Sequence, residues 1–270
     1  MSLAVPHRLL LTSLVGALVI AAPITAFADE LPQGWSGKGQ VGYVMSRGNS
    51  DTDAANAKLD VFLVTPDWKH QFSLDGLFGR SAQVTSAERW DVRLQSDYTV
   101  NDGLFAFGAL AYQDDRFSGF QYQVSASGGL GYKFFDTDTT KLAAQLGVGY
   151  RVLRPETLVT DPNGSGAIID RIPLESESEV VGTAGIDFMH QFNKSTKLTD
   201  KMILESGSSN TSIKNDLALE VKMSKKLALA AGYSVLHNTK PAEGVKRTDT
   251  ITTLNVVYAF ANPGGTGTPN

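Results

Sequence analysis

Hydrophobic and polar side chains alternate along residues 120–152 in two runs. From Tyr122 to Phe134 and from Leu142 to Val152, every second residue is apolar or small, and the intervening residues are mostly polar or glycine. A period of two is the period of a β-strand. Each run has about 12 residues, whereas soluble strands usually have roughly 5–6 and a transmembrane strand needs about 9–11. The pattern therefore predicts two neighbouring strands of a membrane barrel, with one face toward lipid and the other toward a lumen.

The same period recurs along most of the chain and predicts an all-β, transmembrane antiparallel β-barrel of about 12 strands. The predicted strands are 35–46, 55–63, 68–78, 89–100, 104–113, 120–134, 142–152, 180–192, 198–204, 213–223, 227–235 and 254–260. Strand 104–113 is ambiguous because both of its faces are apolar near its start. Strand 198–204 is weak because Asp200 shares a face with Leu198, Met202 and Leu204.

The connections between these strands alternate in length. Short turns of roughly three to six residues, such as 65–67 and 101–103, alternate with longer connections, among them 79–86 and 153–175. Bacterial outer-membrane barrels have an even number of strands, short periplasmic turns and long outer loops. A soluble sandwich has no reason to sort its connections in this way. We also hypothesise that 153–175 folds inward and constricts the lumen, because 167–169 could bury a small apolar element.

The first 28 residues have the pattern of a cleaved, Sec-type signal peptide. Arg8 precedes the apolar stretch 9–24, and Ala26-Phe27-Ala28 is a small-x-small cleavage signal. A membrane-anchoring helix is the alternative, which the polar segment after residue 28 disfavours. We expect residues 29–260 to form an outer-membrane β-barrel and residues 261–270 to be a flexible C-terminal tail.

Charge and composition exclude several classes of function. Without residues 1–28, the chain carries 23 Lys and Arg against 28 Asp and Glu, a net charge of −5, which argues against a nucleic-acid partner. The chain has no cysteine, so it has no disulfide, thiolate metal site or cysteine nucleophile. Only helices and closed barrels satisfy their backbone groups in lipid, and the mature chain has no apolar run of 18 residues.

The chain resembles the domain of unknown function 481 family, the YdiY-like proteins described as salt-induced outer membrane proteins. The matching stretches are Trp35-Ser36-Gly37 with Gly48-Asn49-Ser50, 112–119 (YQDDRFSG), 128–132 (GGLGY) and 147–151 (GVGYR). The resemblance implies an outer-membrane barrel and no established activity. Many such barrels end on an aromatic residue used in assembly, whereas here ten residues follow Phe260. We expect the barrel assembly machinery and outer-membrane lipid to be partners.

Catalytic chemistry has little support in this sequence, and we assign no enzyme activity, catalytic residue, cofactor or metal ion. A hydrolase needs a nucleophile and a base within hydrogen-bond reach. By position, His70 and His190 are expected on the lipid face near the periplasmic ends, and His237 on the inward face near the outer rim. Acidic residues in 114–116 and 161–179 could bind a divalent cation, but acidic loops are more often simply solvated.

The predicted inward face carries charges of both signs. The candidate lumen-lining residues are Lys38, Lys58, Asp60, Asp75, Arg89, Asp91, Arg93, Asp97, Lys133, Arg151, Asp187, Asp216, Glu220 and Lys222, with Lys69, Lys197, Lys201 and Glu205 on the same face. The preferred function is a passive pore for small hydrophilic solutes or ions, sorted by charge. The alternative is a non-conducting structural barrel whose lumen is filled by paired side chains, with a role in salt or osmotic stress that only the family resemblance suggests. Twelve strands lie between the filled and the open barrels, so size does not decide.

Overall fold

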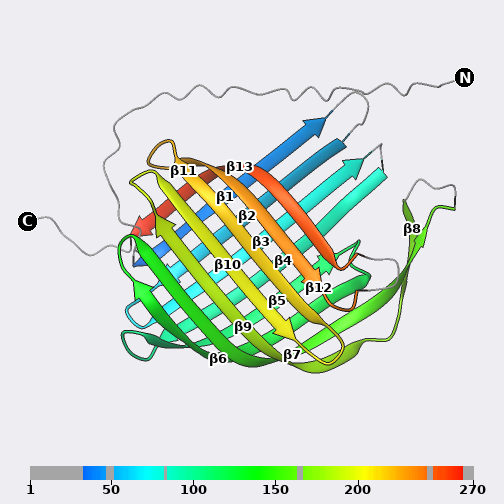
Figure 1. Cartoon of the computed structure of the whole chain (residues 1–270), viewed down its shortest axis with the longest axis horizontal. Coiled ribbons are helices and arrows are strands. Elements are labelled where there is room, and N and C mark those ends of the chain that lie inside the picture. The colour runs from blue at the N-terminus through cyan, green and yellow to red at the C-terminus, as the bar shows by residue number, and fades with distance from the viewer. Residues whose placement is uncertain (1–32, 47–51, 82–83, 163–166, 242–245, 264–270) are drawn as a thin grey trace, which may run out of the picture.

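The computed structural model describes residues 33–46, 52–81, 84–162, 167–241 and 246–263. The expected signal peptide, the loop 47–51 and residues 264–270 lie outside these ranges. The described residues form thirteen antiparallel strands, of which twelve close into a barrel (Figure 1). None of them forms a helix with the length and apolar character that membrane crossing requires.

The barrel follows the order of the chain. Its strands are β1 (Gly34–Ser46), β2 (Thr52–Val64), β3 (Trp68–Ser81), β4 (Val84–Thr99), β5 (Leu104–Asp115), β6 (Phe120–Asp136), β7 (Thr140–Thr160), β9 (Glu177–Gln191), β10 (Thr196–Ser206), β11 (Thr211–Lys222), β12 (Leu227–Asn238) and β13 (Thr248–Pro263). Each strand pairs with its neighbours in this order, and β1 pairs with β13 to close the ring. The predicted fold class and the count of 12 barrel strands are therefore confirmed.

Two predicted loops are strands instead. Residues 79–86 were expected as a long loop, but β3 and β4 continue to a Ser81–Val84 pair. Residues 153–175 were expected as an irregular connection, but β7 runs to Thr160 and pairs with β8 (Ile168–Pro173). This hairpin projects beyond one end of the barrel in Figure 1, and Ile169 on it is 60% exposed. Backbone pairing extends past the apolar pattern because a ladder needs no lipid-facing side chain to continue.

The C-terminal strand is also longer than expected. Residues 261–263 were assigned to the tail, yet β13 continues to Pro263, which lies opposite Gly34 in β1. Phe260 lies opposite Gly37, and its ring occupies the space that a side chain at residue 37 would take. β1 therefore starts at the same end of the barrel at which β13 ends.

The outer wall is an apolar surface, as the period of two predicts. Leu146 and Leu254 are 71% and 70% exposed, and large apolar residues cover the outward face of most strands. Aromatic rings gather near the short turns, where Trp68 stacks on His70 at 5.5 Å and packs against Tyr98. Such rings belong to the aromatic girdle of a membrane barrel. Bacterial outer-membrane barrels have their short turns in the periplasm, and we call this end of the barrel the periplasmic end.

The ambiguous strand β5 turns its bulky residues inward. Phe105 and Phe107 are 7% and 6% exposed, whereas Leu110 on the opposite face is 56% exposed. The two rings lie against Gly131 of β6 and Gly147 of β7, where a side chain would collide with them. Both faces of β5 are apolar because one meets lipid and the other fills glycine gaps inside the barrel.

Candidate functional site

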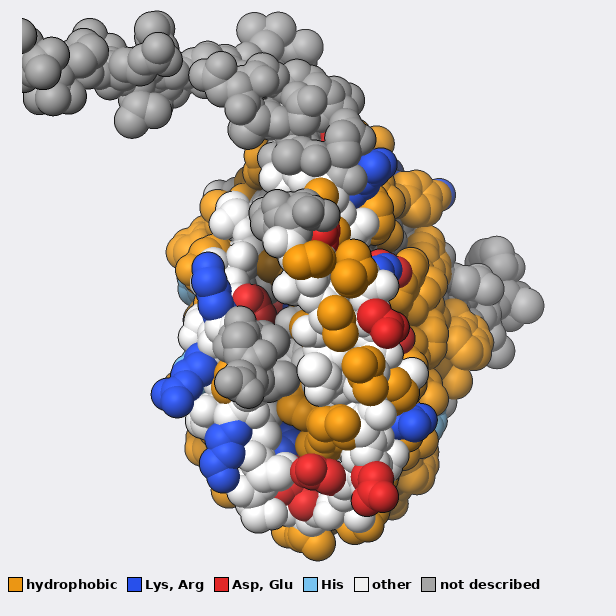
Figure 2. Space-filling model, turned by 90° about the vertical axis from the view of Figure 1, so that its right-hand side faces the viewer, with side chains coloured by type: hydrophobic (Ala, Val, Ile, Leu, Met, Phe, Trp, Pro, Cys, Tyr) orange, Lys and Arg blue, Asp and Glu red, His pale blue; other side chains and the backbone are white. Residues whose placement is uncertain are grey.

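The inward-facing polar side chains form the candidate site, and they occupy three levels along the barrel axis. Arg151 lies near the outer end. Lys58, Asp75, Arg89, Asp91 and Asp216 lie near the middle, and Lys38, Asp60, Arg93, Asp97, Asp187 and Glu220 lie in the periplasmic half. Lys133 and Lys222 lie at the periplasmic rim, where Lys133 forms an ion pair with Asp136 at 3.4 Å. Figure 2 looks onto the outer end, where charges of both signs lie between hydrophobic flanks.

Arg151 is the centre of the outer level. Its guanidinium group, 2% exposed, donates to Glu179 of β9 at 2.5 Å and lies 3.9 Å from Glu205 of β10. Glu205 also accepts a hydrogen bond from the Ser125 hydroxyl of β6 at 3.0 Å. The β6 and β10 strands are not neighbours, so this contact crosses the interior of the barrel. Arg151 and its partners therefore join four strands into one charged network.

The connection between β10 and β11 folds onto this network. The side chain of Ser208 and both the amide and hydroxyl of Ser209 donate to the Glu179 carboxylate. The Arg151 guanidinium donates to the carbonyl of Asn210 at 2.6 Å. Asn210 is itself buried and donates to Asn238 of β12 at 2.8 Å. The connection 207–210 is therefore fixed over the outer end of the lumen instead of extending away from it.

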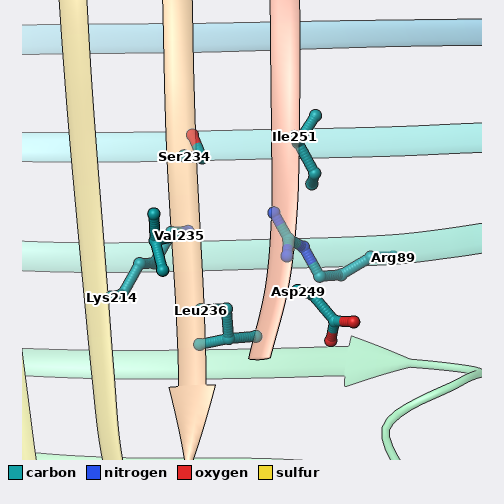
Figure 3. A pocket seen from close by; sticks show the side chains of 7 residues that line it. All are labelled: Arg89, Lys214, Ser234, Val235, Leu236, Asp249 and Ile251. Atoms are coloured by element: carbon teal, nitrogen blue, oxygen red, sulfur yellow. The ribbon is translucent and has the colours of Figure 1, made fainter. Parts of the chain in front are cut away.

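The middle level contains an ion pair between opposite walls. Lys214 of β11 lies 3.4 Å from Asp91 of β4, and Arg89 contacts the same carboxylate at 3.0 Å. The strands that carry Arg89 and Lys214 cross one another in Figure 3, and both side chains lie in the space between the two walls. The cavity beside them has a volume of about 10 Å³, enough for roughly one water molecule. Side chains from opposite walls thus meet in the middle of the lumen.

Two charged side chains of the periplasmic half are exposed to solvent within the lumen. The side chain of Asp187 faces inward from β9 and is 52% exposed, and its partner Lys201 lies 3.6 Å away on β10. Lys69 of β3 is 44% exposed and lies 3.8 Å from Asp97. These charged groups face the interior yet remain accessible to solvent. These two side chains are far more exposed than Arg151 and Glu179 of the outer level.

Several inward charges lack a close partner of opposite sign. Arg93 donates to the amide oxygen of Gln95 at 3.0 Å, and within the described ranges it has no carboxylate at ion-pair distance. Its Nε atom is buried without a hydrogen-bond partner among those residues. A charged group enclosed in this way is stable only if water or a ligand solvates it. Gln95 also donates to Gln145 of β7 at 3.2 Å, a further contact across the interior.

Sequence reasoning missed two residues of this site. Lys214 was not assigned to the lumen, although it has the same parity as Asp216 and the signal was present. Asn210 lies in a connection between strands, where no periodic pattern indicates the direction of a side chain. A third feature is the hydrogen bond of 2.9 Å that Asn56 donates to Asn255 beside Gly42. A side chain at residue 42 would collide with both amides, so the glycine leaves room for this bond.

The prediction for His237 was wrong. It has the same parity as the outward-facing Tyr233, and its ring accepts or donates a hydrogen bond at 2.8 Å with Thr248, the residue opposite it on β13. His70 lies on the outer face, as expected, where it bonds to Ser96 at 2.8 Å and stacks on Trp68. This serine–histidine pair faces the membrane, away from the lumen.

The acidic outer residues mostly contact arginine. Arg171 of β8 lies 2.7 Å from Glu156 and 3.7 Å from Asp114, which ties the hairpin to the β5–β6 connection. Arg116 of that connection pairs with Glu88 at 3.1 Å. Within the described ranges, no group of three or more His, Cys, Asp or Glu side chains is arranged to hold a metal ion.

The chain is similar to one protein family and to several known proteins. Residues 39–260 match the family described as "Protein of unknown function, DUF481". The "Uncharacterized protein YdiY" of Escherichia coli (strain K12) is 22% identical over 232 residues, which cover 84% of this chain and 83% of that protein. The NanC porin is 12% identical with a TM-score of 0.45, covering 84% of this chain and 100% of that one. The COG4313 outer membrane channel from Pseudomonas putida F1 is 10% identical with a TM-score of 0.46, and the match covers 88% of this chain and 100% of that one.

Proposed function

We propose that this chain, which belongs to the DUF481 family of proteins of unknown function, is an outer-membrane pore that passes ions or small hydrophilic solutes through a narrow lumen. Family membership confirms the resemblance that the glycine-rich stretches indicated. The barrel form and its apolar outer wall are those of bacterial outer-membrane proteins.

The solvent-accessible charges of the periplasmic half carry the proposal. Asp187 is 52% exposed although it faces the interior. An ionised carboxylate away from bulk water is costly unless it is paired or hydrated, and its ion pair with Lys201 leaves much of its surface free. Water therefore fills this part of the lumen. A water-filled, charge-lined lumen is the physical requirement for passage of ions.

The outer and middle levels determine how much can pass. Arg151, Glu179 and Glu205 narrow the outer end, and the Lys214–Asp91 pair bridges the middle. Lys214 can change its rotamer without breaking the backbone ladder, because its contact with Asp91 is between side chains. A low conductance with discrete opening events follows from this arrangement.

The alternative is a non-conducting structural barrel. The Lys214–Asp91 pair favours it, because an ion pair that joins opposite walls also holds a barrel closed. In this case the bridging side chains are a permanent filling and the chain contributes to the envelope without transport. A link to salt or osmotic stress is suggested by the family resemblance alone.

A role without enzyme activity is part of the proposal. The serine–histidine pair formed by Ser96 and His70 lies on the outer face, and the His70 ring is stacked on Trp68 in the aromatic girdle. A catalytic pair needs a substrate on the same side of the wall and a third group to orient the histidine. The lipid-facing position offers neither to a soluble substrate.

Conductance in a planar bilayer tests the proposal directly. The refolded barrel is inserted from detergent, and single-channel currents are recorded in symmetric salt and then in a salt gradient. Discrete current steps support the pore. A protein that is folded and inserted, as judged by resistance to unfolding in cold SDS, and that never conducts would exclude it and leave the structural barrel. Detergent alone and heat-unfolded protein are the controls for unspecific leaks.

A further inference from the structure

A polar pair lies on the outer, lipid-facing side of the wall between β10 and β11. The side-chain amide of Asn215 donates to the Asp200 carboxylate at 2.7 Å. Asp200 lies opposite Phe188 of β9 and Leu217 of β11. Its sequence neighbour Lys201 faces the interior, where it pairs with Asp187. Because successive residues of a strand point to opposite sides, Asp200 points outward.

The surroundings of this pair are otherwise apolar. Asn215 lies opposite Met202 of β10 and Val235 of β12. Asp200 is the fifth residue of β10, a strand of 11 residues, which is about the length that crosses a membrane once. The carboxylate therefore lies near the middle of the hydrocarbon layer. An ionisable group at that depth is unfavourable against lipid and normally faces a partner or a water-filled cavity.

A second feature distinguishes the same part of the wall. Neither β10 nor β11 contains a Phe, Tyr or Trp residue. Rings near the periplasmic edge follow on either side, at Phe192 after β9 and at Tyr258 on β13, beyond β12. An aromatic girdle anchors a wall in the interface between lipid and water. Its interruption over the two strands that carry Asp200 and Asn215 marks a face that is not built to contact lipid along its whole length.

The hydrogen-bonding capacity of the pair matches a second copy of itself. Asn215 uses one of its two amide hydrogens and Asp200 uses one of its two carboxylate oxygens in the 2.7 Å bond. Among the residues that the structure describes, neither the second hydrogen nor the second oxygen has a partner. One spare donor beside one spare acceptor is self-complementary under a twofold axis.

We propose that the outer face of β10 and β11 is the contact between two copies of this chain in the membrane. Each Asn215 then donates its second hydrogen to Asp200 of the partner subunit. Two symmetric hydrogen bonds replace the exposure of two carboxylates to lipid. Apolar side chains around the pair, such as Met202 and Leu217, supply van der Waals packing between the two barrel walls.

Cysteine cross-linking tests this contact in the intact membrane. The chain has no cysteine, so one introduced thiol is a unique reporter. Met202→Cys lies beside the pair, and Leu74→Cys on the outer face of β3 is the control, because β3 is opposite β10 in the ring. Oxidation is expected to convert Met202→Cys to a disulfide-linked homodimer and to leave Leu74→Cys monomeric. Equal cross-linking of both variants, no cross-linking of either, or cross-linking of Met202→Cys to a different protein overturns the proposal.

The strength of self-association gives an independent test. Asp200→Leu combined with Asn215→Leu removes both polar groups together, so no unpaired group is left. Loss of two hydrogen bonds in lipid raises a dissociation constant about tenfold. The double variant is therefore expected to raise the dimer dissociation constant by that factor. Thr252→Leu, on the outer face of β13, is the control and is expected to leave the constant unchanged. A double variant that is folded and dimerises as tightly as the natural chain contradicts the proposal, whatever the outcome of the conductance measurement.

Discussion

Lys214 of β11 and Asp91 of β4 meet across the barrel, with 3.4 Å between the Nζ atom and the carboxylate oxygen. Five strands separate β4 from β11 in either direction around the ring, so the two residues come from opposite walls. A contact of this kind divides the lumen into an outer part and a periplasmic part. Whether the pair is a movable constriction or a permanent filling is the question that separates a pore from a structural barrel.

Shortening the lysine of this pair is expected to increase conductance. Lys214→Ala removes the bridge, while Arg89 remains 3.0 Å from Asp91 and keeps the carboxylate paired. The fold should therefore persist while the middle of the lumen widens. Single-channel conductance measures the change, and Lys246→Ala, at an exposed position between β12 and β13, is the matched control. Identical currents for Lys214→Ala and the natural chain would show that this pair does not limit passage.

Neutralising single charges of the periplasmic half is expected to shift ion selectivity in opposite directions. Asp187→Asn removes a solvent-accessible negative charge and should favour anions. Arg93→Gln removes a positive charge whose one direct partner among the described residues is Gln95, and it should favour cations. The reversal potential in a salt gradient reports both changes. Two variants whose potentials move in the same direction would mean that ions do not pass beside these residues.

Removing the buried arginine of the outer level is expected to destabilise the barrel. Arg151→Met leaves Glu179 and Glu205 without their cation, and loss of one partner of a buried ion pair costs about 3–5 kcal/mol. Unfolding by denaturant in micelles measures the free energy of unfolding. Adding Glu179→Leu to Arg151→Met should recover part of the loss, because one of the two uncompensated carboxylates is then absent.

The control for this prediction is another arginine of the same strand. Arg154 donates to the carbonyl of Leu174 at 3.2 Å in an exposed position. Arg154→Met is therefore expected to change the free energy of unfolding by less than about 0.5 kcal/mol. If Arg151→Met and Arg154→Met have equal stability, the Arg151 network does not contribute to the fold as we infer.

The close approach of β6 and β7 predicts a sharp difference between two glycines. A side chain at Gly129 would collide with the backbone of Leu146 and Gly147, whereas nothing lies within 4 Å of the position that a side chain at Gly108 would occupy. Gly129→Ala is expected to destabilise the barrel by about 1–3 kcal/mol, as other overpacked substitutions do. Gly108→Ala should be neutral or slightly stabilising. Denaturant unfolding of both variants checks the difference, and an equal effect would refute the proposed backbone contact.

Most of the wall could be predicted from alternation alone, and the failures have physical causes. Asp200 weakened the prediction of its strand because a carboxylate on a lipid face breaks the pattern that identifies such a face. The loop 79–86 was extended too far because a strand that leaves the membrane loses its alternation but keeps its backbone ladder. His237 was misplaced although its parity with Tyr233 gave the correct direction.

The candidate site was less accessible to sequence reasoning. The direction of Asp187 and Arg93 follows from parity, but the absence of a pattern in the connection 207–210 hid the role of Asn210. Phe105 and Phe107 looked ambiguous because the glycines that receive them are on other strands. The role of each of these side chains depends on a contact with a residue that is distant in the sequence.

The amino-acid sequence by itself determined which side of the wall each side chain takes, because the period of two is a property of the strand and needs no information about its neighbours. It also determined the number of barrel strands, because the alternating runs between the turns can be counted. Only the tertiary structure decided which inward charges meet. Lys214 and Asp91 are 123 residues apart, and their contact exists because closing the ring brings opposite walls together.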